Sequence, residues 1–306
     1  MKTIKWAILG CGNIATSYAT ALAKTEGATL YGAASRSLPK AQEFASKYGF
    51  QKAYGSYEEC IADPEVDAVY IATPHPMHKD LAIAALNAKK AVLCEKPTCL
   101  HKNELEEVLA AAKANDCFFM EAMWTRFQPA FTTAMKYISD GKIGELQNIY
   151  ADICCKNDYY PGSRLYEVEL GGGAAWDLGI YMLTAALSGM SAASGTAFGD
   201  VDPEKFYTII RKAHTGVDAF ETVIMSYKDM IATITAGVDS GSGEVTRAAK
   251  YIGSKGTIVL DGFWYGQSVK LYDTNGTLIS EDKLPFRVNG YEYEAAHVTE
   301  LIAKGE

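Results

Sequence analysis

The sequence predicts an α/β protein of two domains, with a doubly wound parallel sheet in residues 1–120 and an α+β domain with a large, mainly antiparallel open sheet in residues 121–306. The length of 306 residues is typical of about two domains. In the first part, continuous apolar runs alternate with longer segments of helical periodicity, which indicates parallel strands buried on both faces. After about Tyr150, partly alternating β-branched runs are joined by turn residues, which indicates an antiparallel sheet with one exposed face.

Each expected element has its own sequence signal. In the first part the expected strands are uninterrupted apolar runs, at residues 6–9, 28–34, 68–72, 91–94 and 117–119. The expected helices carry apolar residues at helical spacing, at residues 15–24, 40–48, 77–88 and 103–115. The later strands are expected at residues 219–225, 231–236, 249–252, 256–260 and 268–272, with a last helix at about 291–304. Strands that alternate with helices of this length predict βαβ units in the first part.

The composition argues against several classes of protein. The chain has 29 Lys and Arg against 37 Asp and Glu, a net charge of −8, whereas a nucleic-acid binder needs a basic face. Its longest weakly polar stretch, residues 178–190, is shorter than the roughly 20 apolar residues of a membrane span. The seven cysteines have no regular spacing, which indicates a reducing compartment. We therefore expect no nucleic-acid partner, no membrane association and a cytoplasmic location.

The most informative motif follows the first expected strand directly. It is a G-x-G-x-x-A turn, formed by Gly10, Cys11, Gly12, Asn13, Ile14 and Ala15. Gly10 permits a tight turn, Gly12 lets the backbone approach a pyrophosphate, and Ala15 allows close packing of helix on strand. The amides and positive dipole end of the helix N-terminus suit an anion. Because the motif opens a βαβ unit, it predicts a dinucleotide-binding Rossmann domain; a tight turn without a ligand is the alternative.

The end of the second expected strand indicates which dinucleotide binds. An NAD-preferring site has Asp or Glu there, about 20 residues after the glycines. This sequence has Ser35 and Arg36 instead, with Lys40 close behind. A guanidinium clamps a 2′-phosphate and a serine hydroxyl donates to it, whereas a carboxylate repels it. We therefore expect NADP rather than NAD; a solvated Arg36 is the alternative.

Two further loops follow buried strands, where ligands of open α/β sheets bind. The first contains Thr73, Pro74, His75 and His78, and contact with cofactor or substrate competes there with helix capping and loop packing. The two histidines lack a set of further ligands at metal-binding spacing, so no metal is expected. The second loop begins with Glu95 and Lys96, at the end of a buried strand. The Lys96 ammonium there either contacts a ligand or forms a surface ion pair with Glu95.

Together these motifs resemble the Gfo/Idh/MocA oxidoreductases over nearly the whole chain. The resemblance rests on Gly10-x-Gly12-x-x-Ala15, Thr73-Pro74 with His78, Glu95-Lys96-Pro97, and the run from Gly171-Gly172-Gly173 through Trp176-Asp177 to Tyr181. Residues 120–127 and Tyr181 are similar to the subgroup of dimeric dihydrodiol dehydrogenase and NADP-dependent D-xylose dehydrogenase. Many other members have His at the position of Tyr181.

The resemblance implies a role for each of these residues. Lys96, often beside a cis-proline at the position of Pro97, contacts the nicotinamide ribose and the reacting oxygen. Tyr181 acts as general acid/base, and a nearby ammonium lowers its pKa from the ordinary value of about 10. Asp177 lies four residues before Tyr181, one helical turn away, and binds substrate or orients Lys96; helix capping or pairing with an Arg is the alternative. Trp124 is expected to wall the nicotinamide or substrate pocket, or else to fill an interdomain core.

The resemblance therefore implies an NADP-dependent oxidoreductase that moves hydride between nicotinamide and a sugar or cyclic trans-diol. The expected cofactor contacts are made by Gly10, Cys11, Gly12, Asn13, Ile14, Ser35, Arg36, Thr73, Pro74, His75, His78, Glu95 and Lys96, and the expected substrate contacts by Trp124, Asp177 and Tyr181. A non-catalytic NADP-binding sensor and an NAD-dependent glycosidase are the alternatives.

Two expectations concern the assembly and the C-terminus. Members of this family commonly form dimers through the open face of the antiparallel sheet, so a homodimer or a higher homo-oligomer is expected. Relatives usually continue beyond the expected last helix with another segment, whereas this sequence ends at Glu306.

Overall fold

The computed structural model describes residues 2–241 and 247–306, which form two compact units. Unit 1 contains the residues up to Trp124 together with Arg287–Glu306, and unit 2 contains Thr125–Phe286. In this division the first unit ends close to the expected boundary at residue 120. The C-terminal segment, which we expected in the second domain, instead belongs to unit 1.

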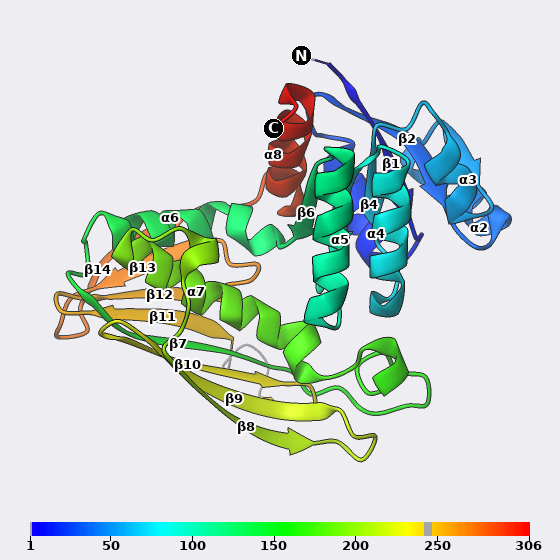
Figure 1. Ribbon diagram of the computed structural model, residues 1–306. Helices are drawn as coiled ribbons and strands as arrows, with labels where there is room; N and C mark the ends of the chain where they lie inside the picture. Colours follow the sequence, from blue (N-terminus) through cyan, green and yellow to red (C-terminus); the bar gives the residue numbers. More distant parts are fainter. Residues whose placement is uncertain (1, 242–246) are drawn as a thin grey trace. The chain divides into compact units, whose positions relative to one another are not determined.

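Unit 1 is built on a six-stranded parallel sheet in the order β3-β2-β1-β4-β5-β6. Figure 1 labels four of its strands, β1, β2, β4 and β6. The strands are β1 (Ile4–Leu9), β2 (Ala28–Ala34), β3 (Lys52–Tyr54), β4 (Ala68–Ile71), β5 (Ala91–Glu95) and β6 (Phe119–Ala122). This is the strand order of the doubly wound dinucleotide-binding fold. The predicted doubly wound parallel sheet is therefore confirmed.

Helices cover both faces of this sheet. They are α1 (Asn13–Leu22), α2 (Leu38–Tyr48), α3 (Tyr57–Ala62), α4 (His78–Asn87), α5 (Lys102–Asn115) and α8 (Tyr291–Lys304). One core cluster includes Trp6, Tyr18 and Tyr70, and a second one includes Leu9, Ile71 and Val92. Successive side chains of a strand point alternately into the two clusters. Both faces of the sheet are therefore buried, and the strand sequences are continuous apolar runs.

The C-terminal helix α8 packs on α1 and β1 of unit 1. Ala295 and Val298 are fully buried in the same core cluster as Trp6, and the Trp6 indole Nε1 donates a hydrogen bond to Thr299 Oγ1 at 3.1 Å. We expected this helix in the second domain because it follows that domain along the chain. Only the apolar face of α8 indicates that the helix packs back on unit 1.

Unit 2 contains an eight-stranded sheet in the order β14-β13-β12-β11-β7-β10-β9-β8. The strands are β7 (Leu146–Cys154), β8 (Lys205–Lys212), β9 (Asp218–Tyr227), β10 (Met230–Gly237), β11 (Ala248–Gly253), β12 (Thr257–Asp261), β13 (Ser268–Tyr272) and β14 (Leu278–Lys283). All neighbours are antiparallel except β7 and β10, so the predicted mainly antiparallel sheet is confirmed.

The helices α6 (Pro129–Ser139) and α7 (Ile180–Ser194) pack on one face of the unit 2 sheet. Ile149, Ile234 and Tyr251 point to that face and are buried in its core. On the other face, side chains such as Tyr150, Ile224 and Ile231 are exposed. The described part of this unit therefore has one covered and one open sheet face.

Several elements were not predicted from the sequence. These are β3, α3, α6, β7, β8 and β14. β3 has three residues and α3 has six, too few for a period to be recognised. All eight residues of β8 are exposed, as suits an edge strand, so β8 carries no pattern of buried positions. Within residues 2–241 and 247–306, none of the helices has the length and apolar character needed to cross a bilayer.

Candidate active site

The glycine turn between β1 and α1 lies at the carboxyl edge of the unit 1 sheet. Gly10 has φ +102°, and a Cβ atom there would lie 2.7 Å from the Ala72 carbonyl oxygen, so only glycine fits. Gly12 is the N-cap residue of α1, and no side chain caps this helix end. A Cβ atom at Gly12 would meet no protein atom within 4 Å. An uncapped helix N-terminus beneath open space fits the pyrophosphate of a dinucleotide.

Polar side chains gather next to this turn. Arg36 is exposed at the end of β2 and lies beside the Tyr57 hydroxyl of α3. Burial raises the pKa of Tyr57, and the Arg36 guanidinium opposes this shift. Burial raises the pKa of the Cys11 thiol to about 11, and the nearby Lys40 ammonium opposes it. Ser35 is buried, with its Oγ accepting a hydrogen bond from the Ser37 amide at 3.3 Å. The expected residues Cys11, Ser35 and Arg36 thus lie together, and Tyr57 is a neighbour that the sequence did not reveal.

His78 connects two loops at the same edge. Its ring is fully buried, with Nε2 2.8 Å from the Thr73 carbonyl oxygen and Nδ1 2.8 Å from the Pro97 carbonyl oxygen. Burial lowers the pKa of His78, and the two carbonyl oxygens, which accept hydrogen bonds from ring N–H groups, oppose this shift. The structure therefore favours the loop-packing interpretation of His78. Pro74 is exposed beside it, and the His75 ring lies 5.7 Å from the His78 ring.

The loop after β5 carries Lys96, and the Lys96–Pro97 peptide bond is cis, as the resemblance implies. Glu95 differs from the expectation of a cofactor contact, because its carboxyl group is buried in the core of unit 1. It accepts hydrogen bonds from the Tyr70 hydroxyl and from the Lys96 amide. Burial raises the pKa of Glu95. Glu95 holds the start of the loop that presents Lys96.

Two further carboxyl groups near this loop were not expected. Glu121 of β6 accepts a hydrogen bond from the Thr98 amide at 2.9 Å. Glu294 of α8 is fully buried, and its carboxyl oxygens have no hydrogen-bond partner among the described residues. Burial, followed by the charges of Glu95 and Glu121, raises the pKa of Glu294 well above its ordinary range.

The second group of expected site residues lies in unit 2, just before α7. We expected an α-helical turn between Asp177 and Tyr181, but residues Ala175–Gly179 form a π-helix, and α7 begins only at Ile180. Helical turns of this type bond residue i to residue i+5 and occur frequently at functional sites. Asp218 of β9 binds the start of this turn, where its Oδ2 accepts a hydrogen bond from the Ala175 amide at 2.6 Å. A Cβ atom at Gly173 would overlap the Asp218 carboxylate, which explains the glycine there.

Asp177 is paired with an arginine that the sequence did not single out. Arg164 Nη1 lies 2.8 Å from Asp177 Oδ1, and the Asp177 side chain is 15% exposed against 60% for Arg164. The alternative left open for Asp177, pairing with an Arg, is therefore present in the structure. Arg164 belongs to the long connection between β7 and α7, where no sequence pattern marks a partner for Asp177.

Tyr181 and Trp124 differ in their surroundings. Tyr181 is half-buried in the first turn of α7. Trp124 is 8% exposed and stacks on Tyr291 of α8, with ring centroids 4.2 Å apart and planes at 8°. Trp124 therefore packs on a residue of its own unit, and both its contact with substrate and its place in an interdomain core stay predictions. No group of three or more His, Cys, Asp or Glu suited to a metal ion occurs among the described residues.

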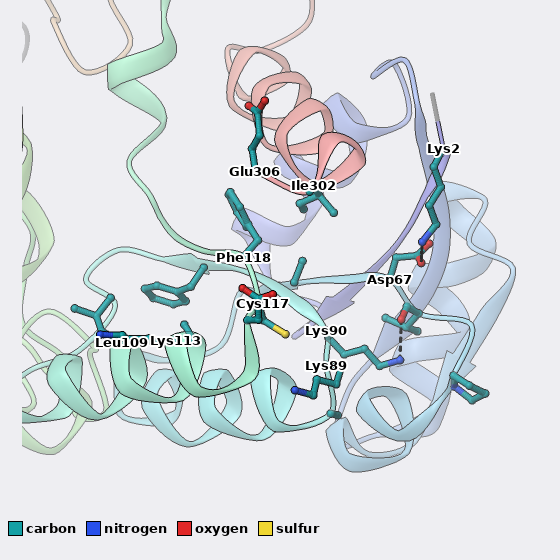
Figure 2. Close-up of a pocket in the computed structure, with 18 residues that line it drawn as sticks. Lys2, Asp67, Lys89, Lys90, Leu109, Lys113, Cys117, Phe118, Ile302 and Glu306 are labelled. Carbon is teal, nitrogen blue, oxygen red and sulfur yellow. Dashed lines mark hydrogen bonds and ion pairs between the residues drawn. The ribbon is translucent and has the colours of Figure 1, made fainter.

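A separate hollow of 960 Å³ lies at the amino edge of the unit 1 sheet (Figure 2). Its lining includes Lys2, Asp67, Lys89, Lys90, Lys113, Phe118, Ile302 and Glu306. Ligands of open α/β sheets bind at the carboxyl ends of the strands, so this hollow is not where a dinucleotide is expected.

Comparisons with known proteins agree with this architecture. Residues 4–123 match the profile of the oxidoreductase family with an NAD-binding Rossmann fold, Gfo/Idh/MocA, and residues 131–259 match the Gfo/Idh/MocA C-terminal domain. The chain is 34% identical to trans-1,2-dihydrobenzene-1,2-diol dehydrogenase from Bos taurus and 32% identical to the human protein of that name. Both matches cover 99% of this chain and 89% of the relative.

Solved structures share the fold at lower sequence identity. An aldose-aldose oxidoreductase from Caulobacter crescentus, complexed with glycerol, is 24% identical with a TM-score of 0.87, covering 100% of this chain and 91% of its own. A 3-ketoreductase from Actinomadura kijaniata, in complex with NADP and TDP-benzene, is 22% identical with a TM-score of 0.85 and the same coverage. Both family profiles and the relatives aligned over 99% of the chain indicate the same family as the glycine turn. This chain therefore belongs to the Gfo/Idh/MocA family of oxidoreductases, as an NAD(P)-dependent dehydrogenase acting on CH–OH groups.

Proposed function

We propose that the protein is an NADP-dependent dehydrogenase of a cyclic trans-diol or an aldose. The observation that carries this proposal is the 34% identity, over 99% of the chain, to a trans-1,2-dihydrobenzene-1,2-diol dehydrogenase. NADP is favoured over NAD because no carboxylate ends β2 and two cations follow it, Arg36 beside Tyr57 and Lys40 near Cys11, which suits a 2′-phosphate. The Actinomadura kijaniata 3-ketoreductase, which has the same fold, is solved with NADP.

Each expected residue has a chemical task in this reaction. The α1 amides and Gly12 would hold the pyrophosphate, and Arg36 would hold the 2′-phosphate. When bound, oxidised NADP would supply the acceptor for a hydride from the carbon that bears the hydroxyl group. Tyr181 takes the hydroxyl proton during oxidation and returns it during reduction. Lys96 stabilises the phenolate form of Tyr181, and Asp177 orients a substrate hydroxyl with Arg164 as its partner.

The test is nicotinamide absorbance with NADP⁺ and a panel of trans-dihydrodiols and aldoses, for the wild type and Tyr181→Phe. We expect kcat to fall by about 10²–10⁴-fold in Tyr181→Phe, the contribution of a general acid/base. Tyr272→Phe, on a strand of the same unit, is the matched control and should keep full activity. Unchanged turnover in Tyr181→Phe would contradict the assignment.

The same panel separates the alternatives. NADPH binding without turnover of any substrate would indicate a sensor. Release of sugar from an aryl glycoside without net cofactor reduction would indicate a glycosidase.

We also propose a homodimer formed through the open face of the unit 2 sheet. Tyr207, Ile209, Ile224 and Ile231 are exposed on β8, β9 and β10, where their register places them on one face of the sheet. An exposed apolar face of this kind favours burial against a second copy. Light scattering should give a dimer mass at micromolar concentration, and Ile224→Glu should give a monomer. A wild-type monomer would contradict the proposal.

A cytoplasmic location is the setting we propose, because all seven cysteines are free thiols. Fractionation of cells should find the protein with cytosolic markers.

A further inference from the structure

Lys96 differs in burial from the residues beside it. Glu95, which ends β5, and the next two loop residues, Pro97 and Thr98, are all buried, whereas Lys96 is partly exposed. The backbone on both sides of Lys96 therefore lies inside unit 1, while the lysine itself extends toward the surface. Backbone amides and carbonyls that are buried in this way need hydrogen-bond partners within the fold.

Two of these partners act at Lys96 and at the residue after it. Glu95 Oε2 accepts a hydrogen bond from the Lys96 amide at 3.2 Å. The Pro97 carbonyl oxygen lies 2.8 Å from Nδ1 of His78, the first residue of α4, whose ring is fully buried. Side chains from a strand and a helix thus hold two successive residues of the loop.

The third partner is Glu121 of β6, the edge strand of the unit 1 sheet. Its Oε1 accepts a hydrogen bond from the Thr98 amide at 2.9 Å. Glu121 is paired with Cys94, one residue before the end of β5, and this register brings its side chain next to the loop. Together with the other two partners, Glu121 completes a set of side-chain contacts at residues 96, 97 and 98.

The charges nearby do not explain a carboxyl group at position 121. Burial raises the pKa of Glu95 and of Glu294, and the charge of Glu121 raises both further. Carboxyl groups that repel one another in this way do not stabilise a fold through their charge. What Glu121 supplies is a hydrogen-bond acceptor for the Thr98 amide.

We propose that Glu121 is a positioning residue for Lys96: by holding the Thr98 amide, it fixes the backbone beyond Lys96 and so sets where the ammonium group lies. A lysine side chain is long and flexible, so the place of its ammonium depends on a fixed backbone. The proposal rests on the function proposed above, because Lys96 takes part in the reaction there.

Hydrogen exchange at single amides tests the contact without turnover. The Thr98 amide should exchange slowly in the wild type, because its hydrogen bond to Glu121 must first open. Glu121→Ala should speed this exchange about tenfold or more, the scale of one lost hydrogen bond to a charged group. Glu121→Gln keeps an acceptor oxygen and should retain most of the protection. Equal protection of Thr98 in the wild type and in Glu121→Ala would overturn the proposal.

Glu104→Ala is the matched control for damage to the same loop. Glu104 Oε2 accepts hydrogen bonds from the Leu100 and His101 amides at 3.1 and 3.3 Å, where the loop enters α5. Its loss should speed exchange at those two amides and leave both Thr98 and kcat unchanged. A fall in kcat as large as that of Glu121→Ala would show that any damage to the loop slows the reaction, and would overturn the proposal.

A double-mutant cycle with Lys96 tests the consequence for the reaction. Glu121→Ala should lower kcat by about tenfold to hundredfold, the scale of a displacement of about 1 Å, and Glu121→Gln should keep most of the wild-type rate. In a Lys96→Ala background, Glu121→Ala should have no further effect, because the group that it positions is absent. The same fall in kcat in both backgrounds would show a merely structural role and overturn the proposal.

Failure of the proposed function is a separate result. Full activity of Lys96→Ala, or no substrate turned over by the wild type, would contradict the role proposed for Lys96 in the reaction. The exchange rate of the Thr98 amide would still decide whether Glu121 holds the loop.

Discussion

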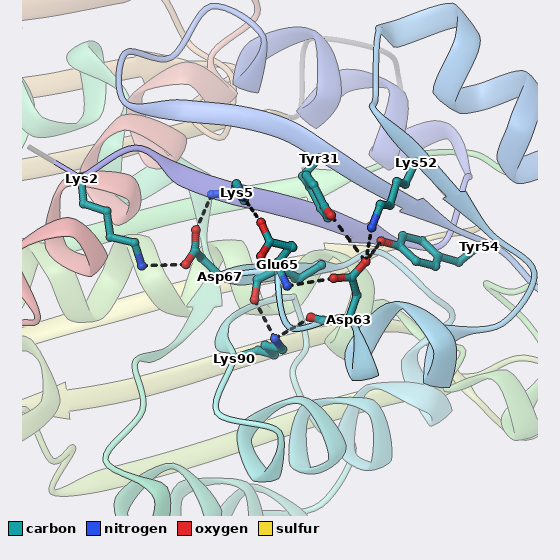
Figure 3. A network of polar contacts seen from close by, with 10 residues as sticks. Lys2, Lys5, Tyr31, Lys52, Tyr54, Asp63, Glu65, Asp67 and Lys90 are labelled. Atoms are coloured by element: carbon teal, nitrogen blue, oxygen red, sulfur yellow. Dashed lines mark hydrogen bonds and ion pairs between the residues drawn. The ribbon is translucent and has the colours of Figure 1, made fainter.

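At the amino edge of the parallel sheet in unit 1, Asp63 accepts hydrogen bonds from Lys52, Tyr54 and the Glu65 amide, and Asp67 pairs with Lys2 (Figure 3). The buried Lys90 donates to two backbone carbonyls there. At the carboxyl edge, the N-terminus of α1 has no side-chain cap and Gly12 faces open space. The amino edge satisfies its own polar groups, whereas the carboxyl edge leaves amides for a ligand.

Stability and ligand binding therefore depend on different edges of this one sheet. Groups whose partners are all within the fold contribute to the free energy of unfolding. Groups directed toward open space contribute to the affinity for a ligand. Substitutions at the two edges should therefore affect different measurements.

Gly10→Ala should have the largest effect on stability, although Gly10 lies at the carboxyl edge. Its Cβ atom would approach the Ala72 carbonyl oxygen, and its φ of +102° is unfavourable for alanine, so the free energy of unfolding should fall by about 2–4 kcal/mol. Gly12→Ala is the matched control, because its Cβ atom meets no protein atom. Gly12→Ala should change stability by less than about 0.5 kcal/mol yet weaken NADPH binding. Urea unfolding and a fluorescence titration with NADPH measure both; equal stability losses in the two variants would contradict the comparison.

Asp63→Ala should affect the amino edge alone. It leaves the Tyr54 hydroxyl, Lys52 and the Glu65 amide without their acceptor, so we expect a loss of about 2 kcal/mol in the free energy of unfolding. The Kd of NADPH should stay the same. The control is Lys52→Met, which removes a 48% exposed partner and should cost under about 1 kcal/mol. A change in NADPH affinity for Asp63→Ala would show that the two edges are coupled.

Arg36→Ala should affect the carboxyl edge alone. The Kd of NADP(H) should rise about tenfold to hundredfold, because a guanidinium contact to a 2′-phosphate is lost, while the Kd of NAD(H) stays the same. Stability should change by less than about 0.5 kcal/mol, since Arg36 is exposed. Lys47→Ala, an exposed cation of α2, is the control for general charge effects. Unchanged affinity for both cofactors would reject the assignment of Arg36.

The same comparison explains which features could be predicted from the sequence. The buried strands and the glycine turn depend on local patterns, so continuous apolar runs and G-x-G-x-x-A identified them. Arg164 pairs with Asp177 and Asp218 accepts a hydrogen bond from the Ala175 amide, and no period or spacing marks such partners. The glycines at positions 173 and 179 were the available signal, because each marks a place where a carboxyl group approaches the backbone. The π-helical turn escaped prediction because its sequence is compatible with an ordinary α-helix.

The smallest expected effect is the pH dependence that Asp63 contributes to stability. The Lys52 hydrogen bond, followed by the Glu65 amide and Tyr54, lowers the pKa of Asp63 from 3.8 to about 2 in the folded protein. Because the folded state binds this proton less readily than the unfolded state, the contribution is complete above about pH 4 and is lost as the pH falls through about 2. The effect is small because Lys52 is half-exposed and water screens the pair. Urea unfolding from about pH 5 to pH 2 should show that the stability difference between the wild type and Asp63→Asn shrinks with acid, since only the wild type loses a charge there. A difference that stays constant over this range would mean that hydrogen-bond geometry, and not the charge of Asp63, stabilises the amino edge.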